Sequence, residues 1–384
     1  MNPALPQLDP ASPHLADVVP AALAAMGARD CAPGFGFGDA SGACVLLIDG
    51  LGAELLDTYA ADAPVLAGIR GQTLQVGYPS TTAAGLAAVG TGRWSGEHGM
   101  VGFTFRVPDA GVAGMPLLNA LRWEPHPWGP DLRDQMIPEE VQPLPTNFER
   151  AMAAGVATHV ISGAEFTGSG LTRAVLRGGR YVGVHALGDL AAEVAQVIDG
   201  RGFCYGYHGD LDKVGHLHGP GSTAWRLQLR QVDRMVESIV DRLPPGGLLA
   251  VVADHGMISV DQDQMVDLDA SAHFIEGVEA IGGEPRARHV YTAPGATEDV
   301  LTTWQTALGD HAWVTTRDQA IAAGWFGPRV DNRVRVRIGD VVVAARDRAV
   351  VIRSAVEPLQ SKLLGHHGSL TSAEQRVPLL IARG

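Results

Sequence analysis

The chain has 384 residues, of which 46% are hydrophobic and 18% are charged, so it can bury the core of one large domain or of about two to three average ones. Its formal net charge of -13 argues against binding to nucleic acid polymers, because proteins that bind them usually present a basic surface. The N-terminal segment has no basic region followed by an apolar core, and no apolar run approaches the roughly 20 residues that cross a membrane, so we expect a cytoplasmic protein without a membrane partner.

The first predicted element is a buried strand over residues 44–48, which ends at Asp49 and Gly50 and leads through a tight turn into a helix. In open parallel α/β sheets, functional side chains gather beyond the carboxyl ends of the strands. Asp49 is therefore placed to point a carboxylate into a crevice. An ordinary helix-capping aspartate is the alternative interpretation, and Asp49 by itself does not separate the two.

The second element is a helix of small residues within residues 78–92, whose start carries Ser80, Thr81 and Thr82. The free N–H groups and the positive dipole at a helix start favour a phosphoryl group. A Thr hydroxyl becomes a good nucleophile only when a base or a metal ion activates it. Taken alone, three hydroxyl residues at this place are more often simple helix caps.

The third element spans residues 203–219 and carries Asp212 and His216 four residues apart. One helical turn puts both side chains on the same face, where they can bind one divalent ion. The amphipathic stretch over residues 225–243 that follows is typical of a helix that packs on the core.

The fourth element is an apolar strand within residues 248–257 that ends in the adjacent pair Asp254 and His255. Isolated buried charges are costly unless they are paired or bound to a metal. The pair therefore indicates a functional site more than a structural one.

The last element, residues 365–381, places His366 and His367 between glycines, followed by a helix start and a strand over residues 377–381. This strand returns the chain to the sheet, so that a late segment reaches the same crevice. One of the two histidines can close the site.

These segments offer oxygen and imidazole ligands and no thiolate, a set that suits zinc, manganese or iron. Their number predicts two divalent metal ions. Two ions about 3.5–4 Å apart can hold both the attacking and the leaving oxygen of an in-line phosphoryl displacement. The sequence thus predicts a two-metal hydrolase that acts on a small phosphorylated substrate.

The chain resembles the alkaline phosphatase superfamily, and within it the type I phosphodiesterase or nucleotide pyrophosphatase family. The resemblance spans nearly the whole chain and follows the family's order in IDGLG, YPSTTAAGLAAVGTG with SGEHGMVGF, DKVGH, ADHGM and GHHG. It implies an α/β fold with a mainly parallel sheet sandwiched by helices. It also implies hydrolysis of a small phosphodiester or pyrophosphate, with nucleotides among the substrates it allows, through a phospho-threonine.

Carried over residue by residue, the resemblance implies two ligand sets: Asp49, Thr82, Asp254 and His255 for one metal, and Asp212, His216 and His367 for the other. It makes Thr82 the nucleophile in preference to Ser80 and Thr81, and it selects His367 over His366. The alternatives within the superfamily are a phosphomonoesterase or a phosphomutase, which would share all seven residues. A catalytically silent metal-binding protein is an alternative of another class.

Two segments bear on the substrate. Three residues after Thr82, where the phosphodiesterase family usually has an Asn that donates to a phosphate oxygen, this chain has Gly85. Either a backbone N–H at the helix start or another side chain replaces this donor, or the enzyme prefers a different ester. The Pro-rich residues 103–145 can cover the crevice. Trp123 and Trp128 within them can stack on a nucleobase, although packing within the loop is the more common role of such residues.

The domain prediction is a single catalytic domain over residues 1–384, interrupted by a small β-rich subdomain over approximately residues 284–351. Within the subdomain, strand-like runs over residues 333–338 and 341–345 flank a candidate hairpin turn at residues 338–340.

Overall fold

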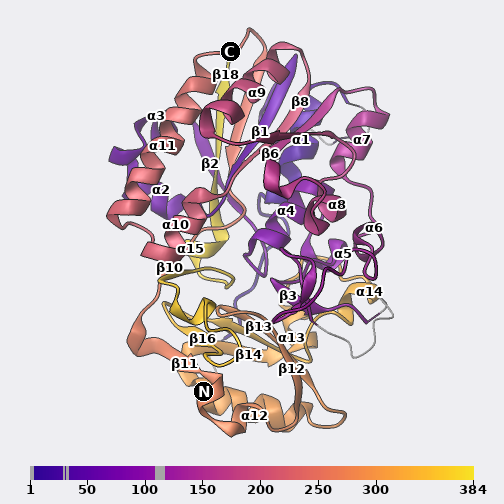
Figure 1. The fold of residues 1–384 in the computed structure, drawn as a ribbon, viewed down its shortest axis with the longest axis vertical. Coiled ribbons are helices and arrows are strands. Elements are labelled where there is room, and N and C mark those ends of the chain that lie inside the picture. Colours follow the sequence, from indigo (N-terminus) through magenta and orange to yellow (C-terminus); the bar gives the residue numbers. More distant parts are fainter. Residues whose placement is uncertain (1–3, 29–30, 32–33, 109–116) are drawn as a thin grey trace.

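The computed structural model describes residues 4–384 except 29–30, 32–33 and 109–116. Its largest element is a seven-stranded sheet of order β2-β18-β9-β1-β8-β6-β7, which fills the upper half of Figure 1. The strands are β1 (Gly42–Ile48), β2 (Gly71–Gln75), β6 (Thr158–Gly163), β7 (Arg180–Val184), β8 (Phe203–His208), β9 (Gly247–Val252) and β18 (Arg376–Arg383). The prediction of a mainly parallel α/β sheet is confirmed, since β9, β1, β8, β6 and β7 run parallel to one another.

The direction of these strands places the predicted site. Every residue of β1 and β9 is buried, as expected for strands covered on both faces. Because β1, β8 and β9 are parallel neighbours, their carboxyl ends meet at one edge of the sheet. In this sheet β18 is the strand that opposes the others, because it runs antiparallel to both of its neighbours, β9 and β2.

Helices cover both faces of the sheet. One face carries α1 (Val18–Ala25), α4 (Thr82–Thr91), α7 (Asn147–Ala153) and α8 (Gly170–Val175), which contact one another. The other carries α9 (Leu187–Asp199), on which α11 (Thr223–Val240) packs, with α3 (Pro64–Gly68) and α10 (Asp210–His218) against α11. The buried residues of α11 recur at helical spacing, so the amphipathic pattern in the sequence is the face that packs on the core.

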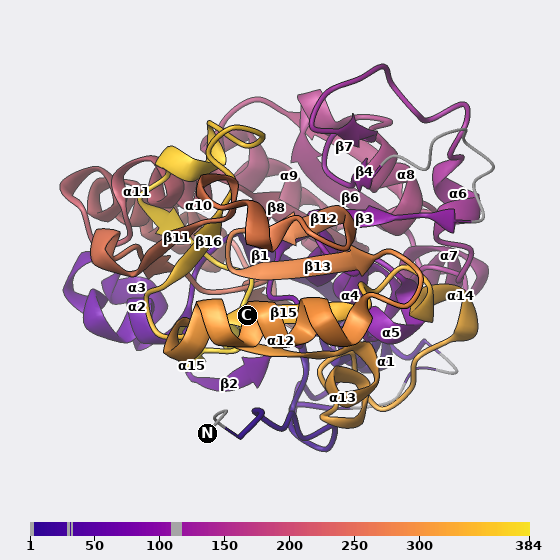
Figure 2. The ribbon, with the colours of Figure 1, turned by 90° about the horizontal axis from the view of Figure 1, so that it is seen from below.

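A second, smaller sheet lies at the other end of the molecule (Figure 1). Its order is β12-β13-β15-β14, with β12 (Val278–Glu284), β13 (Ala287–Thr292), β14 (Ala312–Thr316) and β15 (Val341–Ala345) all antiparallel. The helix α12 (Thr297–Leu308) lies across this sheet, as the view from below in Figure 2 shows. Trp304 of α12 anchors a separate apolar cluster between helix and sheet.

The hairpin predicted at residues 338–340 is wrong. Residues 333–335 belong to a short helix, α14 (Asn332–Arg335), and β15 pairs with β13 and β14 instead. The alternating Val and Arg of this run imitate a strand, but Arg337 uses its guanidinium to bind the carbonyls of Gly99 and Val141. These long-range contacts override the local alternation. The limits 284–351 of the subdomain stay a prediction.

Smaller elements connect the two ends. Two of them are strand pairs, β10 (Ile258–Ser259) with β17 (Gly365–His366) and β11 (Met265–Asp267) with β16 (Val350–Ile352). A third is a three-stranded sheet of β3 (Thr104–Arg106), β4 (Leu117–Asn119) and β5 (Glu124–His126). The short helices are α2 (Ala53–Thr58), α5 (Ser95–His98), α6 (Pro138–Val141), α13 (Arg317–Ala322) and α15 (Ser372–Gln375). Within the described residues, no helix combines the length and the apolar character of a membrane span.

Candidate active site

The first cluster of candidate metal ligands gathers at the carboxyl edge of the large sheet. Asp49 directly follows β1, and Asp254 and His255 follow β9, its parallel neighbour. One donor atom from each of the three lies within 4.8 Å of the others, and all three residues are buried. We call this triad the strand cluster.

A second triad lies beside it and consists of Asp212, His216 and His367, whose donor atoms also lie within 4.8 Å of one another. Asp212 and His216 stand one turn apart on α10, with Oδ2 and Nε2 3.3 Å apart. His367 follows β17, and its Nε2 lies 3.2 Å from Nε2 of His216. We call this triad the helix cluster. The rings of His255 and His367 stack at 3.5 Å between centroids, so the two clusters adjoin.

Each of the three histidines is oriented by a backbone carbonyl. Nδ1 of His216 lies 2.7 Å from the Gly365 carbonyl and Nδ1 of His367 2.9 Å from the Ser80 carbonyl. Nδ1 of His255 lies 3.0 Å from the carbonyl of the next residue, Gly256. A carbonyl only accepts, so each Nδ1 carries a proton and each Nε2 faces the clusters, where it offers its lone pair whenever the ring is neutral. This is the arrangement by which proteins orient metal-binding histidines.

The three consecutive hydroxyl residues at the start of α4 have three different partners. Ser80 donates to the Ser369 carbonyl at 2.8 Å, and Thr81 donates to Oε2 of Glu284 at 2.7 Å. Thr82 lies with its Oγ1 3.2 Å from Nε2 of His255, in the strand cluster. Of the three hydroxyls, Thr82 is the one that faces the candidate ligands.

Two glycines allow the elements to approach this closely. Gly50 has a φ of +74°, and a Cβ there would lie 3.0 Å from Cβ of Asp212. Gly85 lies in α4, and a Cβ there would lie 2.4 Å from Cβ of Asp254. No side chain fits at Gly85, so a donor to a phosphate oxygen must come from another residue or from the backbone.

The residues present fit a pair of cations. Asp49 Oδ1, Asp212 Oδ1 and Asp254 Oδ2 are buried and have no hydrogen-bond partner among the described residues. Unpaired buried carboxylate oxygens are costly, and they are the ligands that divalent metals take. These three carboxylates, with three oriented imidazoles and a hydroxyl, would give each ion oxygen and nitrogen donors and no sulfur.

The pKa values show how strongly the clusters favour positive charge. Burial, together with the nearby Asp49 carboxylate, raises the pKa of Asp212 and of Asp254 well above the usual range. Burial lowers the pKa of His255, but the carboxylates of Asp254 and Asp49 outweigh it and raise it to about 10. Burial and the neighbouring His255 lower the pKa of His367, which keeps its imidazole neutral, the form that binds metals.

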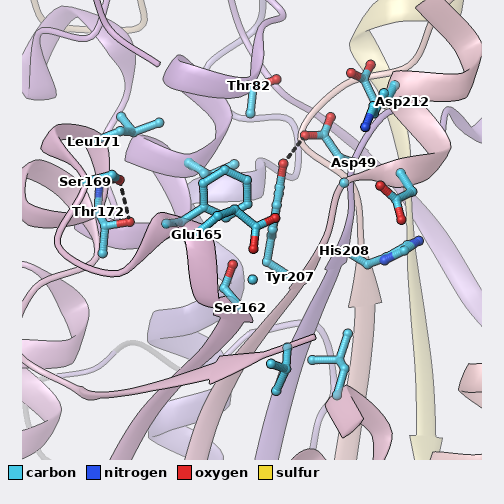
Figure 3. A pocket seen from close by; sticks show the side chains of 18 of the residues that line it. Asp49, Thr82, Ser162, Glu165, Ser169, Leu171, Thr172, Tyr207, His208 and Asp212 are labelled. Atoms are coloured by element: carbon cyan, nitrogen blue, oxygen red, sulfur yellow. Dashed lines mark hydrogen bonds between the residues drawn. The ribbon is translucent and has the colours of Figure 1, made fainter. Parts of the chain in front are cut away.

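A cavity of about 460 Å³ opens from the clusters and is lined by Asp49, Thr82 and Asp212 at one end. Farther out, an apolar wall includes Leu86, Leu171 and Phe166. Figure 3 shows Thr82, Asp49 and Asp212 on one side of the cavity and Glu165, Ser169 and Thr172 on the other. A volume of this size is typical of a site for a small organic molecule.

Two further residues belong to the site, and the sequence alone did not predict them. The Tyr207 hydroxyl donates to Oδ2 of Asp49 at 2.5 Å (Figure 3), and Glu284 binds Thr81. A tyrosine on an apolar strand reads as core packing, and Glu284 stands 203 residues away from Thr81, so no spacing pointed to either.

The structure thus brings together all seven predicted residues, Asp49, Thr82, Asp212, His216, Asp254, His255 and His367. His366 pairs with Ile258 in the β10–β17 ladder and belongs to neither cluster. In the Pro-rich segment, whose residues 109–116 lie outside the described ones, Trp123 is buried and its Nε1 donates to the Met136 carbonyl at 2.6 Å. Trp128 is 61% exposed, and neither Trp lines the cavity.

Comparison with known proteins places these residues in a family context. The family model for type I phosphodiesterase / nucleotide pyrophosphatase matches residues 43–370, which include every residue of the two clusters and Thr82. Among curated proteins, a phosphopentomutase of Anaeromyxobacter dehalogenans (strain 2CP-C) is 33% identical over 131 residues. That match covers 33% of this chain and 30% of the other, so it concerns a part of each protein.

Solved structures share the fold over most of its length. Murine ectonucleotide pyrophosphatase/phosphodiesterase 5 aligns with a TM-score of 0.68 and 14% identity, and the alignment covers 89% of this chain and 88% of the other. Phosphonoacetate hydrolase from Sinorhizobium meliloti 1021, in complex with phosphonoformate, aligns with a TM-score of 0.64 and 19% identity over 89% and 90% of the chains. At these identities the likeness shows a common fold.

Proposed function

The chain belongs to the type I phosphodiesterase / nucleotide pyrophosphatase family, and from this we propose that it is a two-metal phosphodiesterase or nucleotide pyrophosphatase. Its substrate is a small phosphodiester or pyrophosphate, and its intermediate is a phospho-threonine at Thr82. The broader class, a phosphoryl hydrolase of the alkaline phosphatase superfamily, follows from the family itself.

One observation carries the proposal: the Thr82 hydroxyl lies where the strand cluster, the start of α4 and the cavity meet. Its Oγ1 is 3.2 Å from Nε2 of His255, and it lines the same cavity as Asp49 and Asp212. Ser80 and Thr81 are both engaged elsewhere. A nucleophile needs both properties: it must be accessible to the substrate from the cavity, and an activating group must lie next to it.

Zinc, manganese or iron bound by Asp49, Thr82, Asp254 and His255, and by Asp212, His216 and His367, would supply Lewis acidity that lowers the pKa of a hydroxyl or a water. The chain's own groups do the positioning. The backbone N–H groups at the start of α4 face a phosphoryl oxygen, and the positive end of the helix dipole favours its charge.

The reaction then proceeds in two displacements. Oγ1 of Thr82 attacks phosphorus, its P–O bond forms as the bond to the leaving oxygen breaks, and an alcohol or a phosphate leaves with a proton. Water next attacks the phospho-threonine from the opposite side, which releases the phosphoryl product and restores the Thr82 hydroxyl. The site holds phosphorus between the two clusters in both steps, so the same groups serve both displacements.

The cavity supports an organic group on the phosphorus. Its apolar wall, with Leu86, Leu171 and Phe166, suits a ring or an aliphatic group. A structure of an inactive variant of the murine protein holds AMP, which is consistent with a nucleotide as one candidate. The partial likeness to a phosphopentomutase favours a sugar phosphate monoester as the second candidate, with transfer in place of hydrolysis.

A pair of chromogenic substrates tests the proposal. Metal-replete protein is assayed with bis(p-nitrophenyl) phosphate and with p-nitrophenyl phosphate, with Thr82→Ala as the control for contaminating activity. We expect faster cleavage of the diester and its loss by a factor of about 10³ or more in Thr82→Ala, because the nucleophile is gone. Metal analysis of the variant should still find both ions.

Three results would redirect the assignment. Faster cleavage of the monoester would favour the phosphatase or mutase alternative. Turnover retained in metal-replete Thr82→Ala would remove Thr82 as the nucleophile. Bound metals with no turnover of either substrate would favour a silent metal-binding protein.

A further inference from the structure

The helix α4 begins without the side-chain cap that its sequence offers. Thr81 occupies the N-cap position with an extended backbone, φ -136° and ψ 152°, but its side chain accepts no hydrogen bond from the helix. A Thr at this position normally accepts a bond from the second or third N–H of the helix. Among the described residues, the backbone N–H groups of Thr82, Ala83 and Ala84 have no acceptor, and the first helical bond is from Gly85 to the Thr81 carbonyl at 2.9 Å.

Glu284 is the reason why Thr81 does not cap the helix. The Thr81 hydroxyl is turned toward Glu284 and donates to Oε2 at 2.7 Å. Glu284 ends β12 in the small sheet, is 7% exposed, and keeps its Oε1 without a partner among the described residues. The Thr81 hydroxyl is the described side-chain donor to Oε2 of this buried group, so loss of the bond would leave a buried polar atom unsatisfied.

We infer that Glu284 is a positioning residue for the phosphoryl site: by holding the Thr81 hydroxyl, it keeps the first N–H groups of α4 free to bind the phosphoryl oxygens of the substrate. The inference rests on the proposed function for the identity of the ligand. It adds a residue from the small sheet to a site that is otherwise built at the edge of the large one.

The geometry makes the alternative state accessible. Without an acceptor at position 284, a rotation about χ1 of Thr81 would turn its hydroxyl toward the N–H of Ala84, the third residue of the helix. The cap so formed would then compete with the phosphate for the same donors. A cap contributes about 1 kcal/mol, which corresponds to a loss of about fivefold in phosphate affinity.

Binding of inorganic phosphate to the metal-replete protein, measured by calorimetry, tests the inference without any need for turnover. Glu284→Gln keeps an acceptor for Thr81 and serves as the neutral reference for Glu284→Met, which has none. We expect Glu284→Met to bind phosphate about fivefold more weakly than Glu284→Gln. In Glu284→Met with Thr81→Val, no hydroxyl can cap the helix, so the affinity should return to that of Glu284→Gln.

The return in the double variant separates positioning from loss of packing, because a second substitution at a loosened site does not restore binding. Equal affinities of Glu284→Met and Glu284→Gln would overturn the inference, and so would a double variant as weak as Glu284→Met. A wild-type protein that binds no phosphate would overturn it as well. Normal binding with the expected pattern but without cleavage of bis(p-nitrophenyl) phosphate would contradict the proposed function and leave this inference in place.

A second arm avoids any change at Glu284. Thr81→Val alone removes the hydroxyl and with it the possible cap, so phosphate affinity should stay within about twofold of the wild type. Metal content and thermal unfolding are measured on the same samples. A fivefold loss in folded, metal-replete Thr81→Val would show that the hydroxyl itself contacts the phosphate, and the positioning role of Glu284 would be wrong.

Discussion

At the scale of single residues, the candidate site depends on which polar atoms are already engaged. The hydroxyls of Ser80 and Thr81 donate hydrogen bonds to Ser369 and Glu284, so the Thr82 hydroxyl is the one that faces the clusters. In the three histidines of the clusters, Nδ1 is hydrogen-bonded to a backbone carbonyl, so Nε2 is the atom that can bind a metal. The hydrogen bonds of the neighbouring hydroxyls thus single out Thr82, and the hydrogen bonds of Nδ1 thus single out Nε2 of each histidine.

His216 provides a test of the helix cluster. Its Nε2 faces Asp212 at 3.3 Å, whereas His218, two residues later on the same helix, is exposed and has no described partner. We expect His216→Ala to lower the bound metal from about two ions per chain to about one, because a site of three ligands rarely tolerates the loss of one. His218→Ala should keep the metal content of the wild type.

Metal content by elemental analysis, after dialysis against a metal buffer, gives the readout for both variants. Equal metal content in His216→Ala and His218→Ala would contradict the assignment of His216.

At the scale of elements, the site depends on how closely α4 approaches the end of β9. Ten of ten residues of α4 are buried, and small side chains along it let the helix lie against the sheet edge. At Gly85, α4 lies directly against Asp254 of the strand cluster. This helix carries Thr82 at its first position, so its placement sets the position of the nucleophile.

Gly85→Ala tests this approach. The added Cβ would lie 2.4 Å from Cβ of Asp254, so either α4 or Asp254 must move. We expect a loss of about 1–3 kcal/mol in the free energy of unfolding, as for other overpacked cores, together with weaker metal binding in the strand cluster.

Gly188→Ala is the matched control. Gly188 lies in α9, and a Cβ there meets nothing within 4 Å. Because Ala favours the helix and restricts the unfolded chain, this change should stabilise the protein by about 0.4–1 kcal/mol. Urea unfolding measures both, and a Gly85→Ala protein as stable as Gly188→Ala would contradict the close contact.

At the scale of the whole molecule, buried ion pairs tie the small sheet to the rest. Arg286, which directly precedes β13, pairs with Glu374 of α15 at 2.6 Å, next to the start of β18. Arg288 of β13 pairs with Glu357 at 2.7 Å, and Glu357 also binds His126 of β5 at 3.1 Å. Since Glu284 of the neighbouring β12 reaches α4, these pairs also hold the strand that positions Thr81.

Glu357 makes the stability depend on pH. Burial raises its pKa, but the Arg288 charge and the bond with His126 outweigh burial and lower the pKa from 4.5 to about 2. A carboxyl with a lowered pKa in the folded state stabilises the protein above its unfolded pKa, and this contribution is lost as the pH falls toward the folded pKa. The lowered pKa corresponds to a contribution of about 3 kcal/mol to the free energy of unfolding.

We therefore expect Glu357→Gln to lower the free energy of unfolding by about 3 kcal/mol at pH 7. This gap, the difference in free energy of unfolding between the wild type and the variant, should narrow as the pH falls from about 4.5 to about 2. Glu276→Gln, at an exposed position without a described partner, should show no such gap. Urea unfolding at a series of pH values gives the comparison. A gap that does not change with pH would show that lost packing, and not the charge of Glu357, causes the effect.

The sequence by itself determined the elements whose signals are local. Apolar runs predicted β1, β9 and β18, and a residue pattern that resembles the family predicted a mainly parallel α/β fold; both the fold and the family are confirmed. The same local signals marked the polar residues at the strand ends. Their roles as ligands and nucleophile stay predictions, although the structure brings all seven together.

Only the tertiary structure decided the rest, because it depends on contacts between distant segments. The run at residues 333–338 alternates like a strand, yet the bonds of Arg337 to Gly99 and Val141 hold this part of the chain in another conformation. Likewise, no spacing in the sequence joins Glu284 to Thr81 or Tyr207 to Asp49. Local periodicity reports which residues face the core, whereas the partner of a polar side chain is chosen by the packing of whole elements.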